Sequence, residues 1–171
     1  MSEDRVSVRP AEGAADLGEV RRLFTAYADW LQADVCLQGF EAELATLPGD
    51  YAPPRGGLWL GRDRGSAVGV VALRPLPEAG ACELKRLFVE PRARGLGLGP
   101  RLVETCIAAA GRQGYRWLRL ETLEDRMEAA NRLYDGFGFR EAAPYAPMPQ
   151  PEVRSRELDL AANLQVHRVS R

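Results

Sequence analysis

The sequence has little of what metal sites and membrane spans require. It contains one histidine, His167, and three cysteines, Cys36, Cys82 and Cys106, with no Cys-x-x-Cys pair. The wide cysteine spacing predicts buried free thiols, and we expect no bound metal. Charged residues interrupt positions 1–9, where a signal peptide would need an apolar run, and no stretch is apolar enough for a bilayer span.

The charge balance excludes a further class of partner. The formal net charge is -1, which gives no overall cationic field for nucleic acid or for a membrane surface. Nearly all of the positive charge is arginine, and Lys85 is the only lysine. At 171 residues the chain suits one domain, expected over 1–160 with a tail over 161–171. We therefore expect a soluble, cytoplasmic protein that is a monomer or a homodimer.

The most informative segment is the glycine-rich run over 94–99, Arg-Gly-Leu-Gly-Leu-Gly. It follows an apolar strand expected over 84–89 and precedes an amphipathic helix expected over 102–110. Glycine lets the backbone turn sharply beside a ligand, and the free N–H groups at a helix start attract phosphate. The segment therefore predicts an anion site, to which Arg94 adds a permanent charge.

Two other glycine-rich phosphate motifs do not fit this run. The phosphate loop of nucleotide triphosphatases ends in Gly-Lys-Ser/Thr, whereas Gly99 is followed by Pro100 and Arg101. The dinucleotide fingerprint would require glycine at Pro100 or at Leu102. Both mismatches disfavour a generic nucleotide-binding interaction domain. Pro100 suits a first helical turn, although it removes one N–H from the predicted anion site.

A second motif lies in the segment 130–139. Apolar residues recur there at helical spacing, which predicts a helix over 127–137 that ends at Gly136 and Gly138. Asn131 and Tyr134, three residues apart, lie on neighbouring parts of that helix and can reach one ligand together. The two motifs occur in order with a predicted strand between them.

Together the motifs Arg94-x-x-Gly97-x-Gly99 and Asn131-x-x-Tyr134, the latter followed by Gly-Phe, resemble the GNAT N-acetyltransferase superfamily. The resemblance implies acetyl-CoA as co-substrate. It also implies pyrophosphate contacts from Arg94, Gly95, Gly97 and Gly99, backbone contacts to the pantetheine arm from Leu87 and Val89, and a thioester bordered by Asn131 and Tyr134.

The resemblance also suggests the two proton-transfer groups of an acyl transfer. Tyr134 is the candidate acid, because a phenol of pKa about 10 can protonate a departing thiolate of pKa about 8.5. Glu83 is the candidate base for the amine, directly or through water, and Glu121 on the next strand is its rival. Each has a structural alternative: Tyr134 as a core aromatic, and Glu83 as a sheet residue paired with Arg86 or Arg119.

The order of expected elements is mixed. Strands are predicted over 6–10, 58–60, 67–73, 81–89, 115–123 and 152–160. A first helix is predicted after an Asp16 cap, with Glu19 completing a capping box and with an apolar stripe of Leu17, Val20, Leu23, Phe24, Tyr27 and Leu31. Further helices are predicted around 40–47, over 102–110 and over 127–137. This order predicts an α+β protein. It matches the GNAT acyltransferase fold, a central twisted mixed sheet flanked by helices.

The acceptor is the least determined part of the function. The resemblance places its wall at Asp29-Trp30, Asp34, Tyr51 and the segment 145–154, where aromatic and acidic groups suit a cationic amine. We therefore expect an N-acetyltransferase whose acceptor is the primary amine of a small molecule or a peptide. A non-catalytic acyl-CoA-binding regulatory module is the alternative, and such a module could dispense with Tyr134.

Overall fold

A computed structural model describes residues 4–32, 39–147 and 150–163. Its strands form one sheet in the order β1-β2-β3-β4-β5-β7-β6. All neighbouring strands are antiparallel except β4 and β5, which are parallel. The strands are β1 Val6–Pro10, β2 Gly57–Asp63, β3 Ser66–Pro75, β4 Ala81–Val89, β5 Trp117–Leu123, β6 Arg140–Ala142 and β7 Val153–Asp159.

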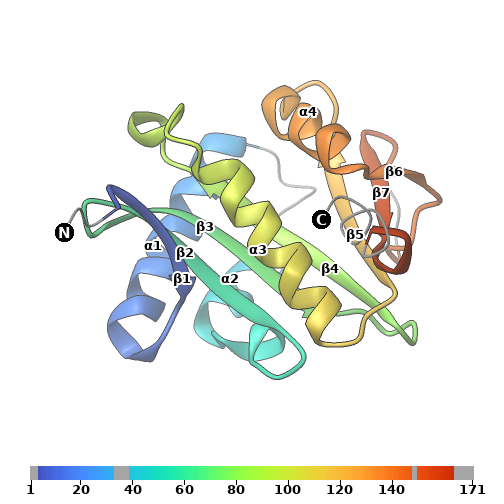
Figure 1. Ribbon diagram of the computed structural model, residues 1–171, viewed down its shortest axis with the longest axis horizontal. Coiled ribbons are helices and arrows are strands. Elements are labelled where there is room, and N and C mark those ends of the chain that lie inside the picture. The colour runs from blue at the N-terminus through green and yellow to red at the C-terminus, as the bar shows by residue number, and fades with distance from the viewer. Residues whose placement is uncertain (1–3, 33–38, 148–149, 164–171) are drawn as a thin grey trace.

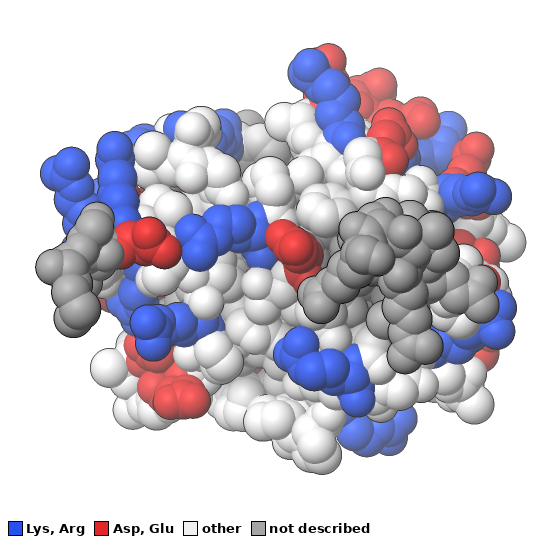
Figure 2. Space-filling view, in the orientation of Figure 1, with Lys and Arg blue, Asp and Glu red and all other residues white. Residues whose placement is uncertain are grey.

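Helices cover both faces of this sheet (Figure 1), which confirms the predicted α+β class. The α-helices are α1 Gly13–Leu31, α2 Phe40–Ala45, α3 Leu98–Arg112 and α4 Glu128–Phe137, with short 3-10 turns at Gly49–Tyr51 and Pro91–Ala93. One core cluster joins α3 and α4 to the sheet, and the other joins α1 and α2 to the opposite face. Acidic and basic side chains are dispersed among uncharged ones on the face shown in Figure 2.

The apolar stripe predicted for the first helix packs against the sheet as expected. Its members Val20, Leu23, Phe24, Tyr27 and Leu31 are buried. On the other face, α3 lies close to the strands because β2 and β3 present Gly61 and Gly69 beneath it. A Cβ at Gly69 would lie 3.1 Å from Leu102 Cδ1, closer than comfortable contact.

The predicted cap of the first helix is wrong. The helix begins at Gly13 with Glu12 as its N-cap, so Asp16 lies within the first turns, where its carboxylate accepts the Glu12 N–H at 2.9 Å. Glu19 forms an ion pair with Arg22 at 2.8 Å instead of completing a capping box. The cap was predicted at Asp16 because the apolar stripe begins at Leu17, whereas the helix continues N-terminally beyond this first apolar residue.

Two further differences concern element boundaries. The third helix starts at Leu98, earlier than predicted, because Gly97 adopts φ +79° and acts as its N-cap. Strand β6 was not predicted, since three residues are too few to show an alternating pattern. It follows α4 in the chain and pairs with β7, so it is the edge strand at that end of the sheet.

Candidate active site

The central feature of the candidate site is the short pairing between β4 and β5. The two strands are in register only at Ala81 with Trp117, Cys82 with Leu118 and Glu83 with Arg119. Both strands continue further, so the β5-facing edge of β4 from Leu84 to Val89 has no partner strand. A cavity of about 280 Å³ lies there, lined by residues of α1, β4, β5, α4 and the segment before β7.

A β-bulge in β4 shapes one wall of this cavity. Ala72 of β3 pairs with Lys85 and Val70 pairs with Phe88, so two β4 residues lie opposite Val71. Arg86 adopts φ +58° at this point. The extra residue brings Lys85 and Arg86, which are adjacent in sequence, to the face covered by α1 and α2. Arg86 there forms an ion pair with Glu43 of α2 at 2.9 Å.

The glycine-rich run forms the predicted turn at the end of β4. Gly95 and Gly97 adopt φ +83° and +79°, and a Cβ on either would meet no protein atom within 4 Å. Among the described residues, the backbone N–H groups from Gly95 to Gly99 donate to no acceptor. Pro100 is the third residue of the helix, where an intrahelical partner is absent in any case. The geometry fits an anion site.

Arg94 flanks this turn with an exposed guanidinium. Its Nε donates to the Val89 carbonyl at 3.3 Å, and the group lies over the Trp30 ring at 5.3 Å from the centroid. Trp30, at the end of α1, is 42% exposed. The pair places a cation between the anion site and the unpartnered edge of β4.

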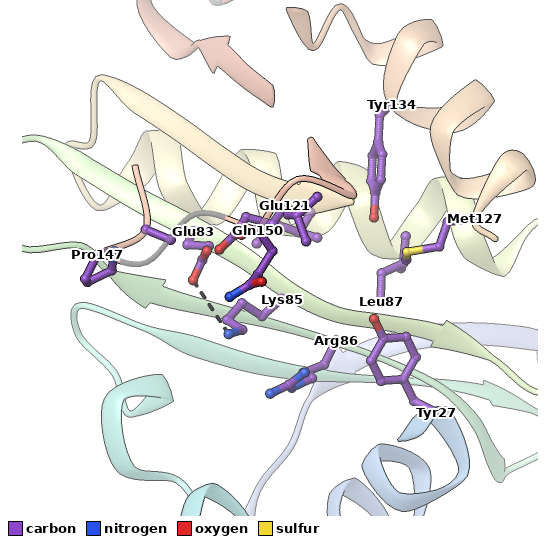
Figure 3. Close-up of a pocket in the computed structure, with 13 residues that line it drawn as sticks. Tyr27, Glu83, Lys85, Arg86, Leu87, Glu121, Met127, Tyr134, Pro147 and Gln150 are labelled. Carbon is purple, nitrogen blue, oxygen red and sulfur yellow. Dashed lines mark ion pairs between the residues drawn. The ribbon is translucent and has the colours of Figure 1, made fainter. Parts of the chain in front are cut away.

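Tyr134 enters the cavity from α4 and is 2% exposed. Figure 3 shows its hydroxyl pointing toward the hydroxyl of Tyr27, which comes from α1 on the opposite face of the sheet. Burial raises the pKa of Tyr134, and Tyr27 adds to the shift. The phenol is thus held protonated, as a proton donor must be, but it is a weaker acid than its free value indicates.

Asn131, which is predicted to border the ligand together with Tyr134, has its side chain hydrogen-bonded within the protein. Asn131 accepts a hydrogen bond from Thr122 Oγ1 at 2.6 Å and donates to the Leu123 carbonyl at 3.2 Å. Both partners belong to β5, and Asn131 does not line the cavity. These bonds fix α4 to the end of β5, from which Tyr134 reaches the cavity.

Glu83 is 1% exposed and its two oxygens are occupied. Arg74 Nε donates to one at 2.7 Å, and the Tyr145 hydroxyl donates to the other. The alternative prediction, in which Glu83 is a sheet residue paired with Arg86 or Arg119, therefore has the wrong partners. Arg86 is paired with Glu43, and Arg119 forms ion pairs with Glu78 and Glu157.

Glu121 faces the same cavity from β5 and is half-buried. It has no hydrogen bond or ion pair within the part of the chain that the structure describes. Burial raises the pKa of its carboxyl, and the nearby charge of Glu83 adds to the shift. Of the two candidate bases, Glu121 is the one with free oxygens.

The cavity also contains residues that the sequence did not single out. Tyr27 was assigned only to an apolar stripe, Lys85 was noted only as the sole lysine, and Gln150 lay within a broad acceptor segment. The sequence contained one indication that Lys85 belongs to the site. It lies two residues after Glu83 on the same strand, and alternate residues of a strand point to the same face. Tyr51 of the expected acceptor wall is buried and donates to Glu43.

The remaining predictions from the sequence fall into two groups. Cys82 and Cys106 are buried free thiols, as predicted. Cys36, Asp34 and His167 lie outside the described residues. Within the described ranges there is no group of three potential metal ligands, and no helix has the length and apolarity to span a membrane.

Comparison with known proteins identifies the class. The model of the acetyltransferase (GNAT) family matches residues 20–139. An uncharacterised N-acetyltransferase of Schizosaccharomyces pombe is 35% identical over 162 residues, covering 94% of this chain and 99% of the relative. The chain therefore belongs to the GNAT family and is an acyltransferase.

Solved structures agree on the fold. A GNAT-family acetyltransferase from Staphylococcus aureus superposes with a TM-score of 0.75 at 20% identity, covering 91% of this chain and 99% of that one. An acetyltransferase structure from Salmonella typhimurium, solved with its cofactor acetyl-CoA, gives 0.66 at 19% identity, covering 92% of this chain and 95% of that one.

The raised pKa of Glu121 predicts a pH-dependent stability effect. Above the folded-state pKa, the carboxylate is ionised in both states, and its burial lowers the stability of the folded chain. Below the unfolded-state pKa, the carboxyl is protonated in both states and does not lower the stability. We expect Glu121→Gln to raise Tm at about pH 8, and the gap from wild type to close toward about pH 4. Thermal melts across this range measure it. The exposed Glu152→Gln is the control, and a gap independent of pH would contradict the assignment.

Proposed function

We propose that this protein transfers the acetyl group of acetyl-CoA to a primary amine by direct attack of the amine on the thioester. The observation that carries the proposal is a continuous path. Free backbone N–H groups from Gly95 to Gly99 suit the pyrophosphate, the unpartnered edge of β4 suits the extended pantetheine arm, and Tyr134 lies at its end. The acetyl-CoA in the Salmonella typhimurium relative of this fold supports the same ligand.

The proposed reaction requires a proton acceptor for the amine and a proton donor for the departing thiolate. The acceptor ammonium first gives a proton to a carboxylate, directly or through water, and the freed nitrogen lone pair forms a C–N bond with the thioester carbonyl. The C–S bond then breaks, and the departing sulfur takes the proton of the Tyr134 hydroxyl. The nitrogen now bonded to the acetyl carbon loses a second proton, which restores Tyr134 through solvent, and the carboxylate releases the first proton to solvent. The products are the N-acetyl amide, the free thiol of coenzyme A and one proton.

We assign the base role to Glu121 ahead of Glu83. Both oxygens of Glu83 accept hydrogen bonds, from Arg74 and from Tyr145, so a further proton would displace one of them. No described residue donates a hydrogen bond to the oxygens of Glu121, and the raised pKa of Glu121 reduces the gap to an ammonium of pKa about 10.4. Glu83 then orients Arg74 and Tyr145 at the cavity wall.

The test of this function is turnover of acetyl-CoA with a panel of primary amines, followed by release of the free thiol. Catalysed release with at least one amine supports the enzyme. Binding of acetyl-CoA with no turnover of any amine would instead favour the alternative, a non-catalytic acyl-CoA-binding module. The retained Tyr134 in the cavity favours turnover.

The anion site predicts a specific effect of Gly97→Val. The side chain would project where the phosphate is expected, since no protein atom lies within 4 Å of the new Cβ. A ligand at a hundred times its Kd stabilises a protein by about 2.7 kcal/mol, and we expect the variant to lose this stabilisation by acetyl-CoA. Differential scanning fluorimetry measures it.

Gly114→Val is the matched control for backbone strain. Gly114 has φ +87° with nothing within 4 Å, and it follows the opposite end of α3. This variant should lose intrinsic stability and keep the shift produced by acetyl-CoA. A wild-type protein whose Tm ignored saturating acetyl-CoA would contradict the proposed cofactor.

The proton-donor role predicts that Tyr134→Phe lowers kcat by about 10²-fold or more with little change in acetyl-CoA affinity. The substitution removes only the hydroxyl, and the ring contact with Phe139 at 5.6 Å is retained. Steady-state kinetics together with calorimetric binding measure the two effects. An equal loss of affinity would support a packing role, and an unchanged kcat would show that another group protonates the thiolate.

The base assignment predicts a pH-dependent deficit for Glu121→Gln. The loss of kcat/KM should be largest near neutral pH and should narrow as the pH approaches about 10.4, where a lysine-like amine is itself deprotonated. The same pH series on Glu83→Gln is the comparison, in which we expect a deficit that varies little with pH. The reverse pattern would assign the base to Glu83.

A further inference from the structure

Four charged groups on the α1/α2 face of the sheet form two ion pairs beside the cavity. Arg74 is paired with Glu83 at 2.7 Å, and Arg86 is paired with Glu43 at 2.9 Å. The Arg86 guanidinium also lies over the Phe40 ring, 5.3 Å from its centroid. Each of these charges therefore has an opposite charge at hydrogen-bonding distance.

Lys85 is a third cation on this face, and among the described residues it donates no hydrogen bond to a carboxylate. Its nearest carboxylate oxygen is Glu83 Oε1 at 4.0 Å, which already accepts the hydrogen bond from Arg74. Burial lowers the pKa of Lys85, and the neighbouring Arg86 and Arg74 lower it further against the opposing effect of Glu83. Among the described residues, the Lys85 ammonium donates no hydrogen bond to a carboxylate and has none closer than 4.0 Å, so it can accommodate an anionic ligand.

Glu121, on the neighbouring strand, is the carboxylate at this cavity that has no hydrogen bond or ion pair within the described ranges. Figure 3 shows Lys85, Glu121 and Gln150 around the same cavity, with the dashed Glu83 contact to Lys85 beside them. A second cavity of about 230 Å³ lies on the α2 side, and Lys85 and Arg86 line both. Lys85 thus lies where the two cavities adjoin.

We infer that the acceptor is an amino acid, that is, a primary amine that also carries a carboxylate. Its ammonium lies against Glu121, and its carboxylate binds the ammonium of Lys85. A zwitterion supplies a cation for Glu121 and an anion for Lys85, the two charged groups lining this cavity that form no side-chain hydrogen bond among the described residues, which an unsubstituted alkyl amine cannot do. The inference rests on the proposed function, because it names the substrate class of the same site.

The kinetic test compares matched acceptors. The twenty standard amino acids are assayed first, and each active one is then compared with its α-amide and with its decarboxylated amine. We expect wild type to favour the free acid by about 10-fold or more in kcat/KM, the range for a charge-assisted hydrogen bond. In Lys85→Gln this ratio should fall to about 1, whereas Lys85→Arg should retain most of it.

Because Lys85 is the only lysine, a binding test needs no activity. Protein labelled with ¹⁵N at lysine gives one Nζ resonance, which should shift on titration with an active amino acid and not with its α-amide. This readout also covers the case in which a substituted chain folds poorly.

The outcomes separate the inference from the proposed function. Acetylation of amides and simple amines as readily as of free acids, or an equal loss for acid and amide in Lys85→Gln, would overturn the amino-acid inference alone. An Nζ resonance of Lys85 that does not shift with any amino acid that the enzyme acetylates would also overturn the amino-acid inference. Failure of every amine in the panel would overturn the proposed function itself.

Discussion

The short pairing of β4 with β5 is the constraint on which the rest of the site depends. Two parallel strands that part after three paired residues leave one backbone edge exposed and open a passage between the two faces of the sheet. Through that passage Tyr134 from α4 and Tyr27 from α1 approach one another, although their helices cover opposite faces. The glycine-rich turn follows at the end of the same exposed edge. The proposed positions of the cofactor, the proton donor and the acceptor thus derive from one local feature.

The bulge in β4 supplies the charges that surround this passage. In a regular strand Lys85 and Arg86 would point to opposite faces, whereas the extra residue brings both to the face of α1 and α2. Glu43 from α2 then neutralises Arg86, and Lys85 remains directed at the cavity. The electrostatics of the proposed acceptor side therefore depend on a backbone irregularity that composition does not reveal.

The predictability of each part follows from how local its cause is. The predictions of the family, the α+β class and the glycine-rich turn are confirmed. These features could be predicted because glycine spacing and apolar periodicity act within a few residues. The partners of Glu83 were wrong and Tyr27 was missed, because these contacts join β4 to β3, to the segment after β6 and to α1. The roles of Tyr134, Glu83 and Glu121 stay predictions.

The most direct test of the account is amide hydrogen exchange with and without acetyl-CoA, since its central claim is that the cofactor binds along β4. Protection should appear at the turn over 95–99 and along β4 from Leu84 to Val89, and β1 should be unaffected. Protection confined to the separate cavity lined by Trp59 and Gln113, with no change along β4, would contradict it.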